Sequence, residues 1–188
     1  MSVKERPAAG STPVSAGSAA RQWLAVLRIV TGLIFLWAFV DKLFGLGYAT
    51  PAARSWLSGG SPTKGFLGNV EVGPFQSIFH AWAGAAWADW LFMLALLGIG
   101  LAVTLGVALR LSAVAGTILL VLMWAAEWPL STTTAAGKPS GSTNPLIDYH
   151  IVFALVLIVA ALFGAGLTWG LGRQWEKLAI VHNNPWLR

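Results

Sequence analysis

The sequence contains no cysteine and few charged residues, and each shortage excludes a class of protein. Without cysteine there can be no disulfide, no thiol redox motif, no covalently attached c-type haem and no cysteine-ligated iron–sulfur cluster. Charged residues make up only 10% of the 188 residues, whereas ordinary soluble domains carry about 25%. A chain this poor in charge is expected in a membrane rather than in water.

Several chemical motifs are also missing. The sequence has no glycine-rich phosphate-binding loop, no nucleophile elbow and no H-E-x-x-H metalloprotease motif. Its net charge is +5, but the lysines and arginines are scattered instead of clustered, so nucleic acid is not an expected partner. The excess of positive charge is better explained by orientation in a membrane.

Hydrophobic residues make up 56% of the chain and gather in four long runs. We predict transmembrane helices at about 23–46, 88–108, 111–129 and 147–170, because a bilayer crossing needs roughly 20 apolar residues. The predicted fold class is therefore all-α: an integral membrane four-helix bundle over residues 23–172.

The two ends of the chain differ in composition from these runs. Residues 1–22 are rich in Ala, Ser, Gly and Pro without an apolar period, which predicts a disordered cytoplasmic tail. A cleaved signal peptide is the disfavoured alternative, because the apolar run is too long and no small-x-small site follows it closely. Residues 173–188 form a second polar, cytoplasmic tail, whose first part could be an interfacial helix.

A long extracytoplasmic loop, residues 47–87, is predicted between the first two helices. Glycine and proline interrupt it too often for a spanning helix. Within it, Phe75, Ile78, Phe79 and Trp82 follow the i, i+3, i+4, i+7 spacing of one helical face. We therefore expect a short amphipathic helix that lies on the membrane or plugs the mouth of the bundle.

The second predicted helix carries small residues at every fourth position: Gly98, Ala102 and Gly106. Such a row lets a neighbouring helix approach closely. We expect this face to pack against another helix of the bundle or, in a scaffold protein, against a partner.

The positive residues predict the orientation of the bundle. One side carries Lys4, Arg6, Arg21, Arg110, Arg173, Lys177 and Arg188. The other side carries only Lys42, Arg54, Lys64 and Lys138. Both termini are therefore expected in the cytoplasm. Arg28 lies one to two turns inside the first helix, and we expect its side chain to reach the headgroups as an anchor.

In this topology, polar residues from all four helices reach the extracytoplasmic end. They are Asp41, Lys42, Asp89, Glu127, Asp148 and His150. In a bundle with short connections, those that face inward would converge into a site. The alternative is that each one ends or caps a helix; Asp89 and Asp148 lie at helix N-termini, where negative charge is favoured.

Glu127 is the sharpest candidate in this set. Trp124 and Trp128 flank it, so we expect it to lie still within the bilayer, where a carboxyl group needs a partner. Lys42 is a candidate partner for Glu127 or Asp148. Asp41 and Lys42, by contrast, point about 100° apart on a helix and need not pair with each other.

His150 has two open interpretations. It is either a hydrogen-bonded residue near the interface or part of a proton relay, because imidazole exchanges a proton near neutral pH. Metal ligation is not expected. His80 could supply a second ligand from the loop, but the spacing is not that of a metal site.

Several stretches of the chain resemble bacterial DoxX-family membrane proteins. They are LRIVTGLIFLWAFVDKLFGLG, GSPTKGFLG, GPFQSIF, DWLFMLALLGIGLAVTLGVALRLSAVAG and NPLIDYHIVFALVL. The resemblance covers about residues 23–172 and includes Arg28, Lys42, Asp89-Trp90 and Asp148-x-His150. The family is named after a subunit of thiosulfate:quinone oxidoreductase. The resemblance therefore implies a four-helix membrane protein linked to quinone reduction and sulfur-compound oxidation, with a companion subunit outside this chain.

The first functional hypothesis is a quinone-linked redox subunit of the bacterial inner membrane. The residues expected around the quinone headgroup are Asp41, Asp89, Trp124 and Trp128. Lys42 or His150 would hydrogen-bond a quinone oxygen, and Glu127 or Asp148 would carry its protons. No cofactor is evident in the chain, so electrons would come from a bound substrate or from a partner.

Two other functions stay open. The protein could be a non-enzymatic scaffold that anchors or assembles envelope redox proteins. A small-solute permease is a third option, which would require four-helix chains to dimerise. The expected partners are the lipid bilayer, a quinone and a companion protein subunit, and oligomer formation stays open.

Overall fold

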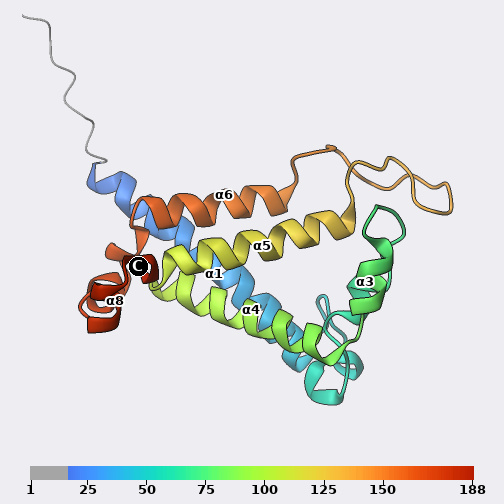
Figure 1. The fold of residues 1–188 in the computed structure, drawn as a ribbon, viewed down its shortest axis with the longest axis horizontal. Coiled ribbons are helices and arrows are strands. Elements are labelled where there is room, and N and C mark those ends of the chain that lie inside the picture. Colours follow the sequence, from blue (N-terminus) through green and yellow to red (C-terminus); the bar gives the residue numbers. More distant parts are fainter. Residues whose placement is uncertain (1–16) are drawn as a thin grey trace, which may run out of the picture.

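The computed structural model describes residues 17–188 as an all-α protein (Figure 1). Its four longest helices are α1 (Ser18–Phe44), α4 (Ala86–Leu105), α5 (Leu109–Glu127) and α6 (Tyr149–Leu162). They run alternately up and down, and both α1 and α5 pack against α4 and α6. The start of α1 and the C-terminus lie at one end, here called the terminus end; the opposite end is called the loop end.

Short helices fill the connections. Between α1 and α4 lie the 3-10 helices η1 (Ala52–Arg54) and η2 (Trp56–Ser58) and the helices α2 (Lys64–Leu67) and α3 (Gln76–Trp82). After α6 come η3 (Ala165–Leu167), α7 (Gly172–Trp175), α8 (Ala179–Asn183) and η4 (Pro185–Leu187). The helix α3 confirms that a short helix forms in the first loop; of its predicted apolar face Phe79 is buried, whereas Phe75 and Ile78 are exposed.

Three helices, α1, α4 and α5, are long and apolar enough to cross a membrane, with 27, 20 and 19 residues. The helix α6 is apolar but has only 14 residues, about 21 Å at 1.5 Å per residue. The prediction of a helix to residue 170 is therefore wrong at its C-terminal end. The helix stops because Gly164 takes a left-handed conformation, with φ of 60°, which opens the way to η3.

The predicted boundary between the N-terminal tail and the first helix is wrong. Residues 1–16 lie outside the described part, but α1 already begins at Ser18, five residues before the predicted start at Trp23. The stretch Ala19-Ala20-Arg21-Gln22 consists of good helix formers, so the helix extends beyond its apolar run.

Close packing of α1 on α4 depends on glycines other than the predicted row. A Cβ atom built on Gly100 would lie 2.9 Å from the backbone nitrogen of Leu36, and one built on Gly32 would lie 2.6 Å from that of Thr104. Gly98, by contrast, is exposed and has no atom within 4 Å of such a Cβ. The prediction that Gly98 marks the packing face within the bundle is wrong, because Gly100 faces α1 instead.

Arg28 does not reach outward as predicted; its side chain is fully buried at the terminus end. One guanidinium nitrogen donates to the carbonyl oxygens of Val103 and Thr104, at 2.5 and 2.6 Å, and the other donates to that of Trp169 at 2.9 Å. The first two carbonyls belong to the last turn of α4, where carbonyls lack partners within the helix and a cation is favoured. Arg28 thus joins α1, α4 and the segment after α6.

The helices approach each other more closely at the terminus end than at the loop end. At the terminus end, a Cβ atom on Gly166 would meet the carbonyl oxygen of Gly106, so the two backbones touch. Towards the loop end α4 and α5 diverge, and α3 lies across the space between them (Figure 1). This divergence positions the candidate site.

Candidate functional site

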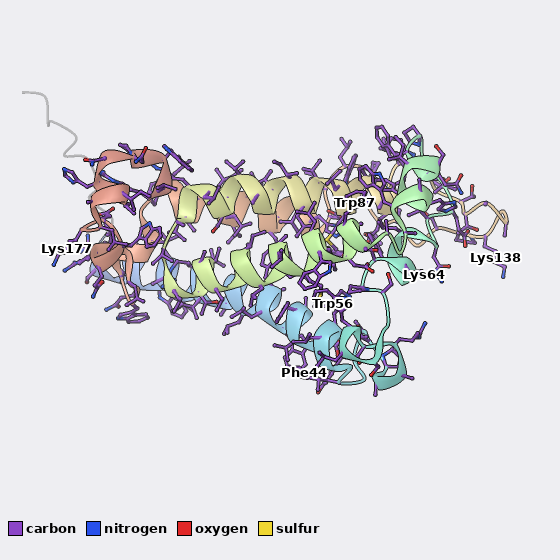
Figure 2. All side chains as sticks on the ribbon, turned by 60° about the horizontal axis from the view of Figure 1, so that its bottom comes forward. Phe44, Trp56, Lys64, Trp87, Lys138 and Lys177 are labelled. Atoms are coloured by element: carbon purple, nitrogen blue, oxygen red, sulfur yellow. The ribbon has the colours of Figure 1, made fainter. Side chains whose placement is uncertain are left out.

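A cavity of about 410 Å³ lies at the loop end between α4 and α5, beneath α2 and α3. Its walls are almost entirely apolar, and the largest side chains that line it include Phe66, Phe79, Trp82, Phe92 and Met123. Trp87, near the start of α4, also lines it and lies towards the α3 segment in Figure 2. The cavity therefore suits an apolar ligand of moderate size.

Lys42, in the last turn of α1, is the single charged residue among those that line the cavity. Its Nζ atom lies 5.8 Å from the ring centroid of Phe92, which is within the range of a cation–π contact. The ion pairs found in residues 17–188 involve His150, so Lys42 pairs with neither Glu127 nor Asp148. That part of the prediction is wrong, because the end of α1 lies beside α4 and not beside α5.

Asp89, in the first turn of α4, holds the loop that forms one wall of the cavity. Its Oδ1 atom accepts hydrogen bonds from the Ser61 hydroxyl at 2.9 Å, the Thr63 hydroxyl at 2.6 Å and the Thr63 amide at 3.0 Å. Thr63 itself lines the cavity, and its hydroxyl also accepts from the Gly84 amide at 3.2 Å. Asp89 is buried behind this wall, so its hydrogen bonds fix the shape of the cavity.

Asp41 has a similar role in the turn after α1. Its carboxylate is buried and accepts hydrogen bonds from the backbone amides of Tyr48 and Ala49, at 3.4 and 3.0 Å. Gly45 ends α1 in a left-handed conformation and donates its amide to the Asp41 carbonyl. The carboxylate of Asp41 thus stabilises the reversal of the chain after α1, next to Lys42.

Trp128 connects α5 to the loop before α3. It ends α5 with φ of 42°, and its ring lies 6.4 Å from that of Phe75 in an edge-to-face arrangement. A Cβ atom on Gly73 would lie 2.9 Å from Cγ of Trp128, so the indole packs directly on that backbone. Trp124 lies 6.1 Å from Trp128. Neither tryptophan is among the residues that line the cavity.

Glu127, Asp148 and His150 come together where α5 ends and α6 begins. The Asp148 carboxylate caps α6 by accepting from the backbone amides of His150 and Ile151, as the sequence predicted. Its Oδ2 atom lies 2.8 Å from Nδ1 of His150, and Oε2 of Glu127 lies 4.0 Å from the same nitrogen. The Tyr149 hydroxyl donates to the other oxygen of Glu127 at 2.9 Å. We call Glu127, Asp148 and His150 the carboxylate–histidine cluster.

His150 and Glu127 differ in exposure. The His150 ring is fully buried, and its Nε2 atom has no hydrogen-bond partner in residues 17–188. The Glu127 side chain is 38% exposed, and the hydroxyl of Tyr149 is the partner that its carboxyl group was expected to need. The cluster is therefore open to its surroundings on one side and closed by the core on the other.

The six polar residues predicted to converge thus lie in three places. Lys42 lines the cavity, Asp41 and Asp89 hold loops, and the carboxylate–histidine cluster forms a separate group. Sequence reasoning missed the loop residues Ser61 and Thr63. Their signal in the sequence is weak: two hydroxyl side chains on either side of Pro62. It also missed most of the apolar lining, which looks like any lipid-facing or core residue along a spanning helix.

Comparison with known proteins adds no relative. No protein family matches the chain, and neither a curated protein nor a solved structure matches it. The arrangement described above, an all-α chain with three helices able to span a membrane and a fourth shorter apolar helix, is therefore the basis for any functional argument.

Proposed function

We propose that this chain is a multi-pass inner-membrane protein, with both termini in the cytoplasm, that binds the headgroup of a membrane quinone. In this proposal it is the DoxX-like membrane subunit of a quinone-linked redox system. The observation that carries the proposal is the apolar cavity between α4 and α5 with Lys42 as its single charge.

The size and polarity of the cavity support a quinone. Ligand pockets of about 300–1,000 Å³ hold small molecules and cofactors, and 410 Å³ falls within that range. A quinone is a flat ring with two carbonyl oxygens and an apolar tail, so it needs apolar walls and one or two donors. The ammonium group of Lys42 is a donor without acceptor capacity, which matches a carbonyl oxygen.

The position of the cavity supports entry from the bilayer. Leu91 of α4 and Ile118 of α5 both line it, and both are strongly exposed, at 63% and 57%. The helices that carry them are long and apolar enough to span a membrane. An apolar tail can therefore lie between these helices while the headgroup reaches Lys42.

The chemistry of reduction is consistent with a cation at this place. A quinone that becomes a quinol takes up two electrons and two protons, and negative charge develops on its oxygens before they are protonated. A fixed positive charge stabilises that state. The electrons must come from a reductant, thiosulfate in the case that the resemblance implies, through a companion subunit, since the chain carries no evident electron carrier.

A scaffold is the second candidate function. Gly98 is exposed on α4 and has open space beside it, so the backbone of another helix could approach closely there. A scaffold would hold partner proteins without binding quinone, and the experiment below separates the two functions.

The test uses the full chain in lipid nanodiscs. Binding of a ubiquinone or menaquinone analogue would be followed by quenching of tryptophan fluorescence, because Trp82 and Trp87 line the cavity. We expect Lys42→Met to weaken binding about tenfold, the effect of losing one charged hydrogen bond of roughly 1.4 kcal/mol. Ala95→Phe should block the cavity and abolish binding. Lys138→Met, in an exposed loop, is the matched control.

Two results would reject the quinone proposal. One is a wild-type chain that binds neither analogue at concentrations where a known quinone protein is saturated. The other is a chain whose Lys42→Met and Ala95→Phe variants bind as tightly as the control. Thiosulfate-dependent quinone reduction in native membranes, and the proteins that co-purify from them, would then test the redox and scaffold functions.

A further inference from the structure

The carboxylate–histidine cluster is not part of the cavity, and its geometry has the features of a cation site. Glu127, Asp148 and His150 each offer one potential ligand atom, and these three atoms lie within 4.8 Å of one another. They come from the ends of two different helices, so the fold and not a short sequence motif brings them together. We propose that this cluster binds a divalent first-row transition-metal ion, with Zn²⁺ as the ion that fits best.

The distances are close to those of a bound metal. Zinc lies about 2.0–2.2 Å from histidine nitrogen and carboxylate oxygen, so neighbouring ligands of a tetrahedral site are roughly 3.3 Å apart. The two distances from Nδ1 of His150, 2.8 Å to Asp148 and 4.0 Å to Glu127, bracket that value. The ligand atoms of the cluster lie within 4.8 Å of one another, so each has to move by roughly 1 Å to form a three-ligand site.

The charges of the cluster also favour a cation. Two carboxylates face one neutral or protonated ring, and in residues 17–188 no lysine or arginine forms an ion pair with either of them. His150 is fully buried and directs Nδ1 at both carboxylates, while its Nε2 atom is unpartnered. A metal ion would replace the proton shared by Asp148 and His150 and would neutralise the second carboxylate, Glu127.

The surrounding groups hold the ligands in place. The Tyr149 hydroxyl binds Oε1 of Glu127 and leaves Oε2 directed at His150. The amides at the start of α6 bind Oδ1 of Asp148 and leave Oδ2 for the metal. Such outer hydrogen bonds orient the ligands of metal sites. Each carboxylate therefore has one oxygen fixed by the protein and one oxygen available.

The donor set indicates the class of ion. Imidazole and carboxylate suit Zn²⁺, Mn²⁺ and Fe²⁺, whereas soft ions such as Cu⁺ prefer sulfur ligands. Affinity at such a site rises from Mn²⁺ to Cu²⁺ and falls again at Zn²⁺, and Zn²⁺ fits best here because it accepts three histidine or carboxylate ligands and a water in a tetrahedral site. The exposed side of Glu127 leaves room for water as a further ligand, so the site would be open rather than closed.

The experiment measures Zn²⁺ binding to the full chain in nanodiscs, after chelator treatment and removal of any histidine tag. Titration calorimetry and the melting temperature would be recorded for wild type, Glu127→Gln and Asp148→Asn. Both substitutions keep the local fold, because glutamine still accepts from Tyr149 and asparagine is a good helix cap. Glu71→Gln, in the exposed first loop, is the matched control.

We expect wild type and Glu71→Gln to bind one Zn²⁺ per chain with the same affinity, and to melt at a higher temperature as Zn²⁺ increases. Each cluster variant should bind at least tenfold more weakly. The proposal is overturned if wild type binds no Zn²⁺, if the cluster variants bind as tightly as the control, or if Ca²⁺ binds as tightly as Zn²⁺, which would indicate an anionic surface only. Glu127, Asp148 and His150 do not line the proposed quinone cavity. The outcome of the Zn²⁺ titration is therefore independent of whether the chain binds quinone.

Discussion

Replacement of Arg28 by methionine is expected to destabilise the protein more than any other single loss of charge. The guanidinium group is fully buried and donates to three carbonyl oxygens, those of Val103, Thr104 and Trp169. Methionine fills much of the volume but donates nothing, so the carbonyls of Val103, Thr104 and Trp169 each lose a charged donor, and Val103 keeps only the amide of Gly106. The structural consequence is that α1 loses its hydrogen bonds to α4 and to the segment after α6, while the packing of α1 on α4 remains.

The magnitude follows from these contacts. A hydrogen bond to a charged group contributes about 1.5–3 kcal/mol, but the cost of burying the guanidinium offsets part of the sum. Removal of one partner from a buried charged contact typically costs about 3–5 kcal/mol. For a chain of this size each kcal/mol corresponds to roughly 2–4 °C, so we expect the melting temperature of Arg28→Met to fall by about 6–20 °C.

The assay is thermal unfolding in nanodiscs, with two further variants. Arg28→Lys keeps the charge but loses the planar fork that reaches Trp169 and the end of α4 together, so its melting temperature should lie between those of Arg28→Met and wild type. Arg173→Met, at an exposed position of the same end, should change little. If Arg28→Met and Arg173→Met melt within about 2 °C of each other, Arg28 does not hold the terminus end together.

Two other substitutions test the structure elsewhere. Asp89→Ala removes the acceptor of three loop hydrogen bonds. We expect this substitution to lower stability by about 1–3 kcal/mol and to increase hydrogen exchange across residues 60–68. Unchanged exchange would show that the loop is held by its apolar contacts alone. Gly100→Ala should lower stability by about 1–3 kcal/mol, because its Cβ would meet the backbone of Leu36. Gly98→Ala should instead be neutral or stabilising by up to about 1 kcal/mol. Equal melting temperatures for the two variants would contradict the assigned α1–α4 contact.

The helices themselves could be predicted from the apolar runs, because the pattern that makes a helix spanning is local. The predicted ranges 88–108 and 111–129 differ from α4 and α5 by two or three residues at each end. The early end of α6 could not be predicted in this way. Its position depends on Gly164 and on packing of the following segment against Gly106, which the composition of the run does not reveal.

The candidate site was predictable only where its parts are close in sequence. Asp148 and His150 are two residues apart, so a capped first turn that brings them together follows from the sequence. The contact of Glu127 with this pair depends on the packing of α5 beside α6. The separation of Lys42 from Glu127 depends on the divergence of α4 and α5, which no spacing in the sequence encodes.

The two ends of the bundle differ in packing. The residues that stabilise the bundle lie at the terminus end, and the residues of the proposed ligand cavity lie at the loop end. At the terminus end, the backbones of Gly106 and Gly166 touch, and the hydrogen bonds of Arg28 join α1, α4 and the segment after α6. At the loop end, α3 keeps α4 and α5 apart, and Asp89 and Trp128 fix the loop that carries it. An empty cavity between helices is costly, but α4 and α5 are apolar enough to span a membrane, where the apolar tail of a lipid can fill it. The closed end can therefore supply the stability that lets the open end keep space for a ligand.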